Sequence, residues 1–188
     1  MTPKYASLSD RDLLARVIGV RAAKKLYQGS LHPLFCDDEP VQDERCLAAK
    51  ELVRRWLHEE MRDVPTMSSP AAVKAYLQAH FARRDYEAFV VVFLDTQHRL
   101  IAVEEMFRGT LSQTSVYPRE IVKAALQHNA AAVLLAHNHP SGIAEPSRAD
   151  ESLTHALKNA LSLIDVRVLD HIVIGAASAV SFAERGLL

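Results

Sequence analysis

The stretch that decides the fold is AAAVLLAHNHPSGIAEPSRAD, residues 130–150. Its first seven residues are apolar, and a run of this length and composition is typical of a buried strand. The chain is still extended where it leaves the strand, so residues two apart project to the same side. His137 and His139 are two such residues. The sequence therefore predicts two imidazoles aimed at one point at the end of a strand.

The remainder of this stretch predicts a turn followed by a helix. Pro140 and Gly142 turn the chain, and Pro146-Ser147 is typical of a helix start. Asp150 would then lie in the first helical turn, where it could return to the two histidines. Two neutral imidazoles and one carboxylate leave zinc an open fourth position, which is the arrangement of a catalytic zinc site.

A competing interpretation of the same residues needs no metal. Ser147-x-x-Asp150 also fits a variant of the capping box, with a serine N-cap and an acid at position N3. The two interpretations are compatible, because a cap that starts the helix would also aim Asp150. Two histidines at a strand end, a turn and an acid at a helix start together favour a metal site formed by His137, His139 and Asp150.

Composition sets the broad class of the protein. A chain of 188 residues has room for one sizeable domain, or for a main domain plus a small appendage. It is 49% hydrophobic and 24% charged, as is usual for a soluble globular protein. The formal net charge of −1 gives the whole chain no electrostatic attraction to nucleic acid or acidic membranes. No apolar run reaches the length of a membrane span and the N-terminus lacks a signal-peptide core, so we expect a cytoplasmic protein without a membrane partner.

The first third of the chain reads as a separate helical region. We expect short helices over about 9–18 and 19–26 and a longer one over about 42–61. Two prolines in residues 65–70 then mark the most credible boundary. The prediction is a helical N-terminal region over 1–65 and a metal-binding domain over 66–188. Cys36 and Cys46 match no common zinc or redox spacing, so we expect free thiols.

Strand and helix patterns alternate in the second region. Residues 88–94 are apolar without interruption, which indicates a strand covered on both faces. The pattern predicts an α/β or α+β fold, a sheet with helices on its faces. The expected helices are about 70–83, 118–128 and 147–163, and the expected strands are 88–94 with its hairpin partner 100–107, 130–136, 166–174 and a short last one at 181–182.

Hydrolysis at such a metal site also requires a base. The candidates are Glu87, Glu104, Glu105 and Glu145. Glu87 is the most attractive, because a carboxylate between a helix end and a buried strand is partly desolvated. Ser147 would cap the helix or donate a hydrogen bond to an oxyanion. A further histidine, His171, fits either a partly buried strand residue or a partner of a ligand.

These residues resemble a known family. His-x-His-Pro-x-Gly followed by Ser-x-x-Asp is the metal-binding pattern of the JAMM metallohydrolases, also called JAB or MPN+ proteins. Within that family the chain is similar to the bacterial RadC-like branch from about Ser69 to Leu188. The matching segments are Val103–Leu111, Pro118–Glu120, His128–Ala132, Ala136–Gly142, Val168–His171 and Ser181–Gly186.

The resemblance implies a cytidine-deaminase-like JAB/MPN sandwich and zinc on His137, His139 and Asp150. It also implies that Ser147 supports the transition state. In the wider family the base is a glutamate where the first helix meets the first strand, a position that Glu87 occupies here. Eukaryotic relatives cleave isopeptide bonds to ubiquitin-like proteins. The expected activity is therefore zinc-dependent hydrolysis of a peptide or isopeptide bond in a protein or peptide substrate.

The alternative function is DNA repair, the label long attached to the RadC-like branch. The protein would then bind or process DNA, with the metal site accessory or vestigial. Basic pieces at Arg21–Lys25 and Arg54-Arg55 favour it. RadC-like chains usually carry a helix-hairpin-helix upstream, but the hairpin glycines are missing here and the acids Asp37–Glu39 stand near that place. A third hypothesis is a binding module whose metal is only structural.

Overall fold

A computed structural model of the protein describes residues 8–27, 29, 43–63, 70–82, 84–109, 116–176 and 178–188. The chain forms two compact units, Met1–Trp56 and Leu57–Leu188. Most of the predicted boundary at 65–70, Cys36 and the place of the missing hairpin near Asp37–Glu39 lie outside the described residues.

The first unit is helical where it is described. It contains α1 (Asp10–Ile18), α2 (Val20–Leu26) and the first part of α4 (Glu44–Asp63). The Ser9 side chain caps α1 by accepting from the backbone N–H of Asp12. The small core of this unit includes Ile18, Ala23 and Cys46, and Cys46 is a free, buried thiol. In the part of the chain that the structure describes, no helix is long and apolar enough to cross a membrane.

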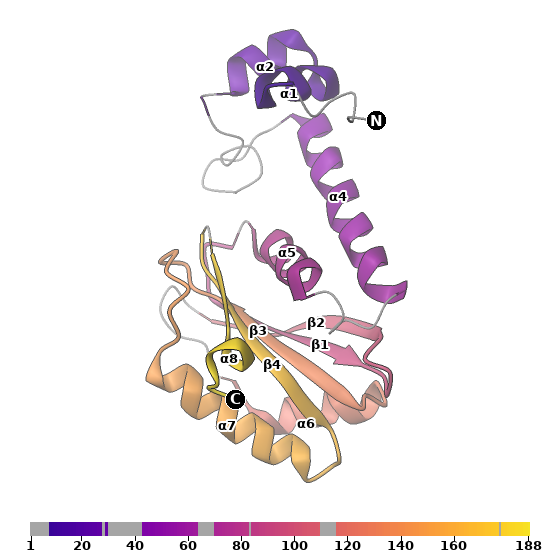
Figure 1. The fold of residues 1–188 in the computed structure, drawn as a ribbon, viewed down its shortest axis with the longest axis vertical. Coiled ribbons are helices and arrows are strands. Elements are labelled where there is room, and N and C mark those ends of the chain that lie inside the picture. Colours follow the sequence, from indigo (N-terminus) through magenta and orange to yellow (C-terminus); the bar gives the residue numbers. More distant parts are fainter. Residues whose placement is uncertain are drawn as a thin grey trace. The chain divides into compact units, whose positions relative to one another are not determined.

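The second unit is a five-stranded sheet with helices on both faces, which confirms the predicted α+β class (Figure 1). The sheet order is β2-β1-β3-β4-β5. Strand β3 runs parallel to β4, and the other neighbouring strands are antiparallel. The elements are α5 (Pro70–Phe81), β1 (Ala88–Leu94), β2 (Leu100–Arg108), α6 (Pro118–Gln127), β3 (Ala132–Asn138), α7 (Arg148–Ser162), β4 (Arg167–Ile174), β5 (Ala179–Ser181) and α8 (Phe182–Arg185).

Alternation along the central strands divides the core between the two faces. The even-numbered residues of β1 pack with α5, and the odd-numbered ones pack with α6 and α7. All seven residues of β1 are buried, as predicted for a strand covered on both faces. Along β3 the odd series Val133, Leu135 and His137 continues the α6/α7 face, so the first histidine lies at the end of a hydrophobic layer.

The predicted and observed boundaries differ, among other places, at β3 and at the end of the chain. Strand β3 begins at Ala132 and runs through Asn138, two residues later at each end than the apolar run. Asn129, with φ of 50°, still belongs to the preceding turn, and pairing with β4 continues to Asn138 opposite Ile174. Residue Phe182, predicted as strand, begins α8, because the Ser181 side chain accepts from the backbone N–H of Glu184 and caps a helix.

Candidate metal centre

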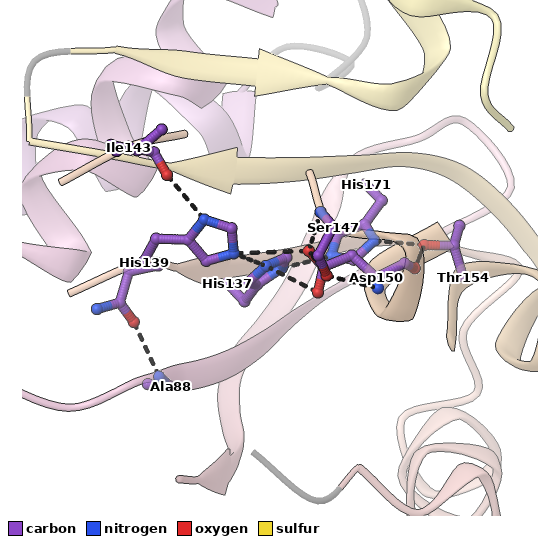
Figure 2. Close-up of polar contacts among 9 residues, drawn as sticks. Ala88, His137, His139, Ile143, Ser147, Asp150, Thr154 and His171 are labelled. Atoms are coloured by element: carbon purple, nitrogen blue, oxygen red, sulfur yellow. Dashed lines mark hydrogen bonds and ion pairs between the residues drawn. The ribbon is translucent and has the colours of Figure 1, made fainter. Parts of the chain in front are cut away.

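Strand β3 delivers two histidines to one point. His137 is its next-to-last residue and is buried, and His139 follows the strand and is half-buried. The two Nε2 atoms are 3.0 Å apart. The predicted convergence of these imidazoles is therefore present, and Figure 2 shows both rings directed toward Asp150.

The N-terminus of α7 delivers the carboxylate. Ser147 is the N-cap, and its side chain accepts from the backbone N–H of Asp150 at 3.2 Å. The Asp150 Oδ2 atom in turn accepts from the backbone N–H of Ser147 at 2.7 Å, completing a capping box. Asp150 Oδ1 lies 3.4 Å from His137 Nε2, and Oδ2 lies 3.5 Å from His139 Nε2. The contacts between Ser147 and Asp150 that cap α7 thus also hold the carboxylate beside the two histidines.

The three donors have the spacing that a small tetrahedral metal ion requires. Ligand atoms about 2.0–2.1 Å from zinc lie about 3.3 Å from one another in a tetrahedron. The two Nε2 atoms are 3.0 Å apart, and each lies near that distance from its closest carboxylate oxygen of Asp150, 3.4 Å from Oδ1 for His137 and 3.5 Å from Oδ2 for His139. His137, His139 and Asp150 also form a group whose ligand atoms all lie within 4.8 Å of one another. The residues fit a divalent metal ion with one ligand atom from each side chain.

The charges of the three groups favour a cation between them. Hydrogen bonding to Asp150 raises the pKa of His139, although burial opposes the rise. Burial disfavours the Asp150 carboxylate, but the adjacent His137 and His139 imidazoles outweigh it and hold the pKa of Asp150 well below its ordinary value. An ionised carboxylate therefore faces two imidazoles whose Nε2 atoms nearly touch. Without a metal, a proton on His139 supplies part of the positive charge that faces this carboxylate.

The outer nitrogens of the two imidazoles each have a partner. His139 Nδ1 lies 2.7 Å from the carbonyl oxygen of Ile143 in the loop before α7. His137 Nδ1 lies 2.8 Å from Nε2 of His171, whose Nδ1 lies 2.6 Å from the hydroxyl of Thr154 in α7. Burial is the main reason that the pKa of His171 falls well below its ordinary value. His171 is therefore a neutral residue beside the candidate ligand His137.

Glu87, the predicted base, precedes β1 on the side of the sheet that carries the histidines. Phe89 pairs with His137 at the end of the antiparallel β1–β3 pairing, so Glu87 and His139, each two residues further on, both lie just beyond that end. Glu87 is half-buried, and its charge contributes to the raised pKa of His139. These observations support the assignment of Glu87 to the site, where its role as base stays a prediction.

The other three acids considered as bases are engaged elsewhere. Glu104 lies 2.8 Å from His128 Nε2, and Glu105 forms an ion pair with Arg84. Glu145 forms an ion pair with Arg185 at 2.6 Å, which lowers the pKa of Glu145. Of the four candidates, Glu87 is the one whose charge contributes to the raised pKa of His139.

Ser147 approaches the site, but its hydroxyl proton is already used. The hydroxyl donates to Asp150 Oδ2 at 2.7 Å while accepting from the backbone N–H of Asp150. A serine hydroxyl has one proton. In this state Ser147 orients the carboxylate, and supporting a transition state would require its hydroxyl to turn.

Two contributions were missed from the sequence. Asn138, between the two histidines, bonds backbone groups of Tyr86 and Ala88 on both sides of Glu87. Thr154 links α7 to His171. A polar residue between the two histidines at the end of an apolar run was a usable signal for Asn138, whereas a threonine within an amphipathic helix gave none.

Comparison with known proteins places this chain in a family. The family model described as RadC-like JAB domain matches residues 67–187. A UPF0758 protein of Methylibium petroleiphilum is 62% identical over 149 residues, covering 79% of this chain and 67% of the relative. A UPF0758 protein of Janthinobacterium sp. is 53% identical over 203 residues, covering 97% and 91%. One from Variovorax paradoxus is 61% identical over 142 residues, covering 76% and 63%. The chain therefore belongs to the RadC-like JAB domain family.

Proposed function

We propose that this protein is a zinc-dependent hydrolase of the JAMM type that cleaves a peptide or isopeptide bond with water as the nucleophile. The observation that carries the proposal is the convergence of His137, His139 and Asp150, whose ligand atoms, one from each residue, all lie within 4.8 Å of one another. Three protein ligands leave an open position on zinc, as catalytic sites require. The bond type comes from the resemblance to JAMM proteins.

A bound zinc ion would supply Lewis acidity, polarising the scissile carbonyl and lowering the pKa of water. The rest of the chemistry belongs to the chain. Glu87 would accept a proton from the attacking water as the new C–O bond forms. It would then deliver that proton to the nitrogen as the C–N bond breaks, which yields a carboxylic acid and an amine. Its place just before β1, its partial burial and the contribution of its charge to the raised pKa of His139 support this role.

Ser147 would support the developing negative charge on the substrate oxygen. To do so its hydroxyl would turn its proton away from Asp150 Oδ2, the acceptor 2.7 Å away. The backbone N–H of Ser147 also donates to the same carboxylate oxygen at 2.7 Å, so Asp150 would stay oriented during this change. Ser147 therefore has a structural role that persists and a catalytic role that is transient.

The test uses the full chain loaded with zinc and a mixture of peptides that includes one branched through a lysine side-chain amide. Cleavage in ¹⁸O-labelled water would place one heavy oxygen in each new carboxyl group, which mass spectrometry detects. Removing the metal with a chelator should abolish cleavage, and restoring zinc should return it. Absence of cleavage of both peptide and isopeptide bonds by the zinc-loaded protein would contradict the proposed activity.

The role of Glu87 has a matched control. Glu87→Gln keeps the shape of the side chain but cannot take a proton, so kcat should fall by about 10²- to 10⁴-fold while zinc affinity is retained. Glu145→Gln changes an acid paired with Arg185 and should leave turnover unchanged. Wild-type turnover in Glu87→Gln would assign the base to another residue.

A further inference from the structure

His171 is a buried polar residue that the proposed chemistry does not use. It belongs to β4, is 0% exposed and lies between the ligand His137 and the helix α7. Its ring stacks on Phe182 with centroids 4.8 Å apart and forms a T-shaped contact with Phe89 with centroids 5.5 Å apart. Figure 2 shows His171 between His137 and Thr154. Both of its nitrogens have polar partners, so the direction of each hydrogen bond can be determined.

The direction is set at Thr154. Its hydroxyl donates to the backbone carbonyl oxygen of Asp150 at 2.6 Å, and a carbonyl oxygen can only accept. A threonine hydroxyl has a single proton, so it must accept in its second contact, at 2.6 Å from His171 Nδ1. The proton of that bond therefore belongs to Nδ1 of His171.

The same logic continues to the ligand. A neutral imidazole with its proton on Nδ1 has a lone pair on Nε2, and His171 Nε2 lies 2.8 Å from His137 Nδ1. His137 must donate there, which leaves the lone pair of its own Nε2 toward His139 and Asp150. A doubly protonated His171 would reverse this last bond and put the His137 proton on Nε2. Full burial between two phenyl rings disfavours that charged form.

We infer that Thr154 and His171 are positioning residues that hold the proton of His137 on Nδ1 and so keep its Nε2 available as a ligand. The chain of hydrogen bonds ends at the backbone carbonyl of Asp150, the residue whose carboxylate lies beside His137 Nε2. The inference rests on the proposed function in one respect, which is that His137 Nε2 binds a metal ion. Partners that orient a histidine ligand in this way are typically worth about 10- to 100-fold in metal affinity.

The test compares two substitutions at one position in the full chain. Thr154→Val keeps the shape of the side chain and removes the hydroxyl, so zinc affinity, measured by competition with a chelator, should fall by about 10- to 100-fold. Thr154→Ser restores a hydroxyl and should recover most of that loss. Ser152→Ala is the matched control, because Ser152 makes the same hydroxyl-to-carbonyl bond within α7, to Arg148, but faces no histidine. Its zinc affinity should equal that of the wild type.

A spectroscopic readout separates this inference from the proposed function. Long-range ¹H–¹⁵N correlation spectra show which nitrogen of each histidine carries its proton, with or without zinc. Both His137 and His171 should carry it on Nδ1 in the wild type, and Thr154→Val should shift His137 away from that state. A proton on Nε2 of His171, or wild-type zinc affinity in Thr154→Val, would overturn the inference. A wild-type protein that binds no zinc would instead contradict the proposed function. The spectra would still show whether Thr154 and His171 hold the proton of His137 on Nδ1.

His171→Phe provides a second variant. The phenyl ring fills the buried space but cannot accept from His137, so zinc affinity should again fall by about 10- to 100-fold. Thermal unfolding of the zinc-free variant reports whether the unit still folds. A folded His171→Phe protein with wild-type zinc affinity would overturn the inference as well.

Discussion

The side chain of Asn138 holds the backbone on both sides of Glu87. Its Nδ2 donates to the carbonyl oxygen of Tyr86 at 3.0 Å, and its Oδ1 accepts from the backbone N–H of Ala88 at 2.8 Å. Asn138 also separates the two histidines in the sequence. The end of β3 therefore places the two imidazoles on one side. Asn138, the residue between them, fixes the start of the neighbouring strand β1.

Removing this clamp should affect both stability and the proposed base. Asn138→Ala leaves two backbone groups without their partners, so the free energy of unfolding in urea should fall by about 2–4 kcal/mol. The zinc affinity should stay within a few fold of the wild type, whereas kcat should fall because Glu87 is no longer held. Asn159→Ala, at an exposed position of α7, is the control and should leave the free energy of unfolding, the zinc affinity and kcat unchanged. Equal losses of zinc affinity and kcat in Asn138→Ala would show that the clamp acts on the ligands.

Ser147→Ala tests the double role of the helix cap. Loss of an N-cap side chain costs about 1 kcal/mol of unfolding free energy. Asp150 also loses one of its two orienting donors, so zinc affinity should fall by about 10-fold. Ser162→Ala, at the other end of α7, should change neither. If kcat falls no further than the loss of bound zinc explains, the hydroxyl acts only as a cap.

The loop that carries His139 lies close against the end of β4. A Cβ atom on Gly175 would lie 2.5 Å from the carbonyl oxygen of Gly142 and 2.8 Å from the backbone nitrogen of Ala144. Gly175→Ala must therefore displace this loop, including the Ile143 carbonyl that bonds His139. We expect a loss of about 1–3 kcal/mol in unfolding free energy together with weaker zinc binding.

Gly186→Ala is the control for that substitution. Gly186 has φ of 68° but nothing within 4 Å of an added Cβ. Backbone strain should destabilise this variant by about 1 kcal/mol without changing its zinc affinity. Equal zinc affinities in the two glycine variants would contradict the role of the loop.

Zinc binding should release a proton that comes from His139. Its pKa lies above the ordinary value of 6.5, so near pH 6.5 much of the metal-free protein carries a second proton on this ring. Zinc requires the unprotonated nitrogen, so affinity should rise with pH until His139 has lost that proton. Asp150 should contribute none, because its lowered pKa keeps it ionised. Calorimetric titrations in buffers of different ionisation enthalpy count the protons, and zero release near pH 6.5 would contradict this assignment.

The predictable parts of the fold were those recorded in local sequence. The uninterrupted apolar run of β1 indicated burial on both faces, and the serine and acid three residues apart indicated the cap of α7. The ends of β3 were not predictable in this way. An apolar run indicates which residues are buried, but it does not indicate where the hydrogen bonding to a neighbouring strand begins and ends. His137 and Asn138 continue the strand through their pairing with β4 although they are polar.

The parts of the site that escaped prediction depend on contacts between distant segments. Thr154 and His171 lie 17 residues apart, and Asn138 lies 50 residues from Ala88. Such bonds depend on the register of the sheet and on hydroxyl direction, which no local pattern encodes. The DNA-associated alternative also stays a prediction, because the region in which a hairpin would bind DNA lies outside the described residues.

The central claim is that His137, His139 and Asp150 bind one catalytic metal ion, and a zinc titration tests it most directly. The metal-stripped full chain is titrated with zinc against a competing chelator, and bound metal is counted by mass spectrometry. The wild type should bind one zinc ion per chain, and Asp150→Ala should bind it more than about 100-fold more weakly. A wild-type chain that takes up no zinc, or an Asp150→Ala chain that binds it with wild-type affinity, would contradict the claim.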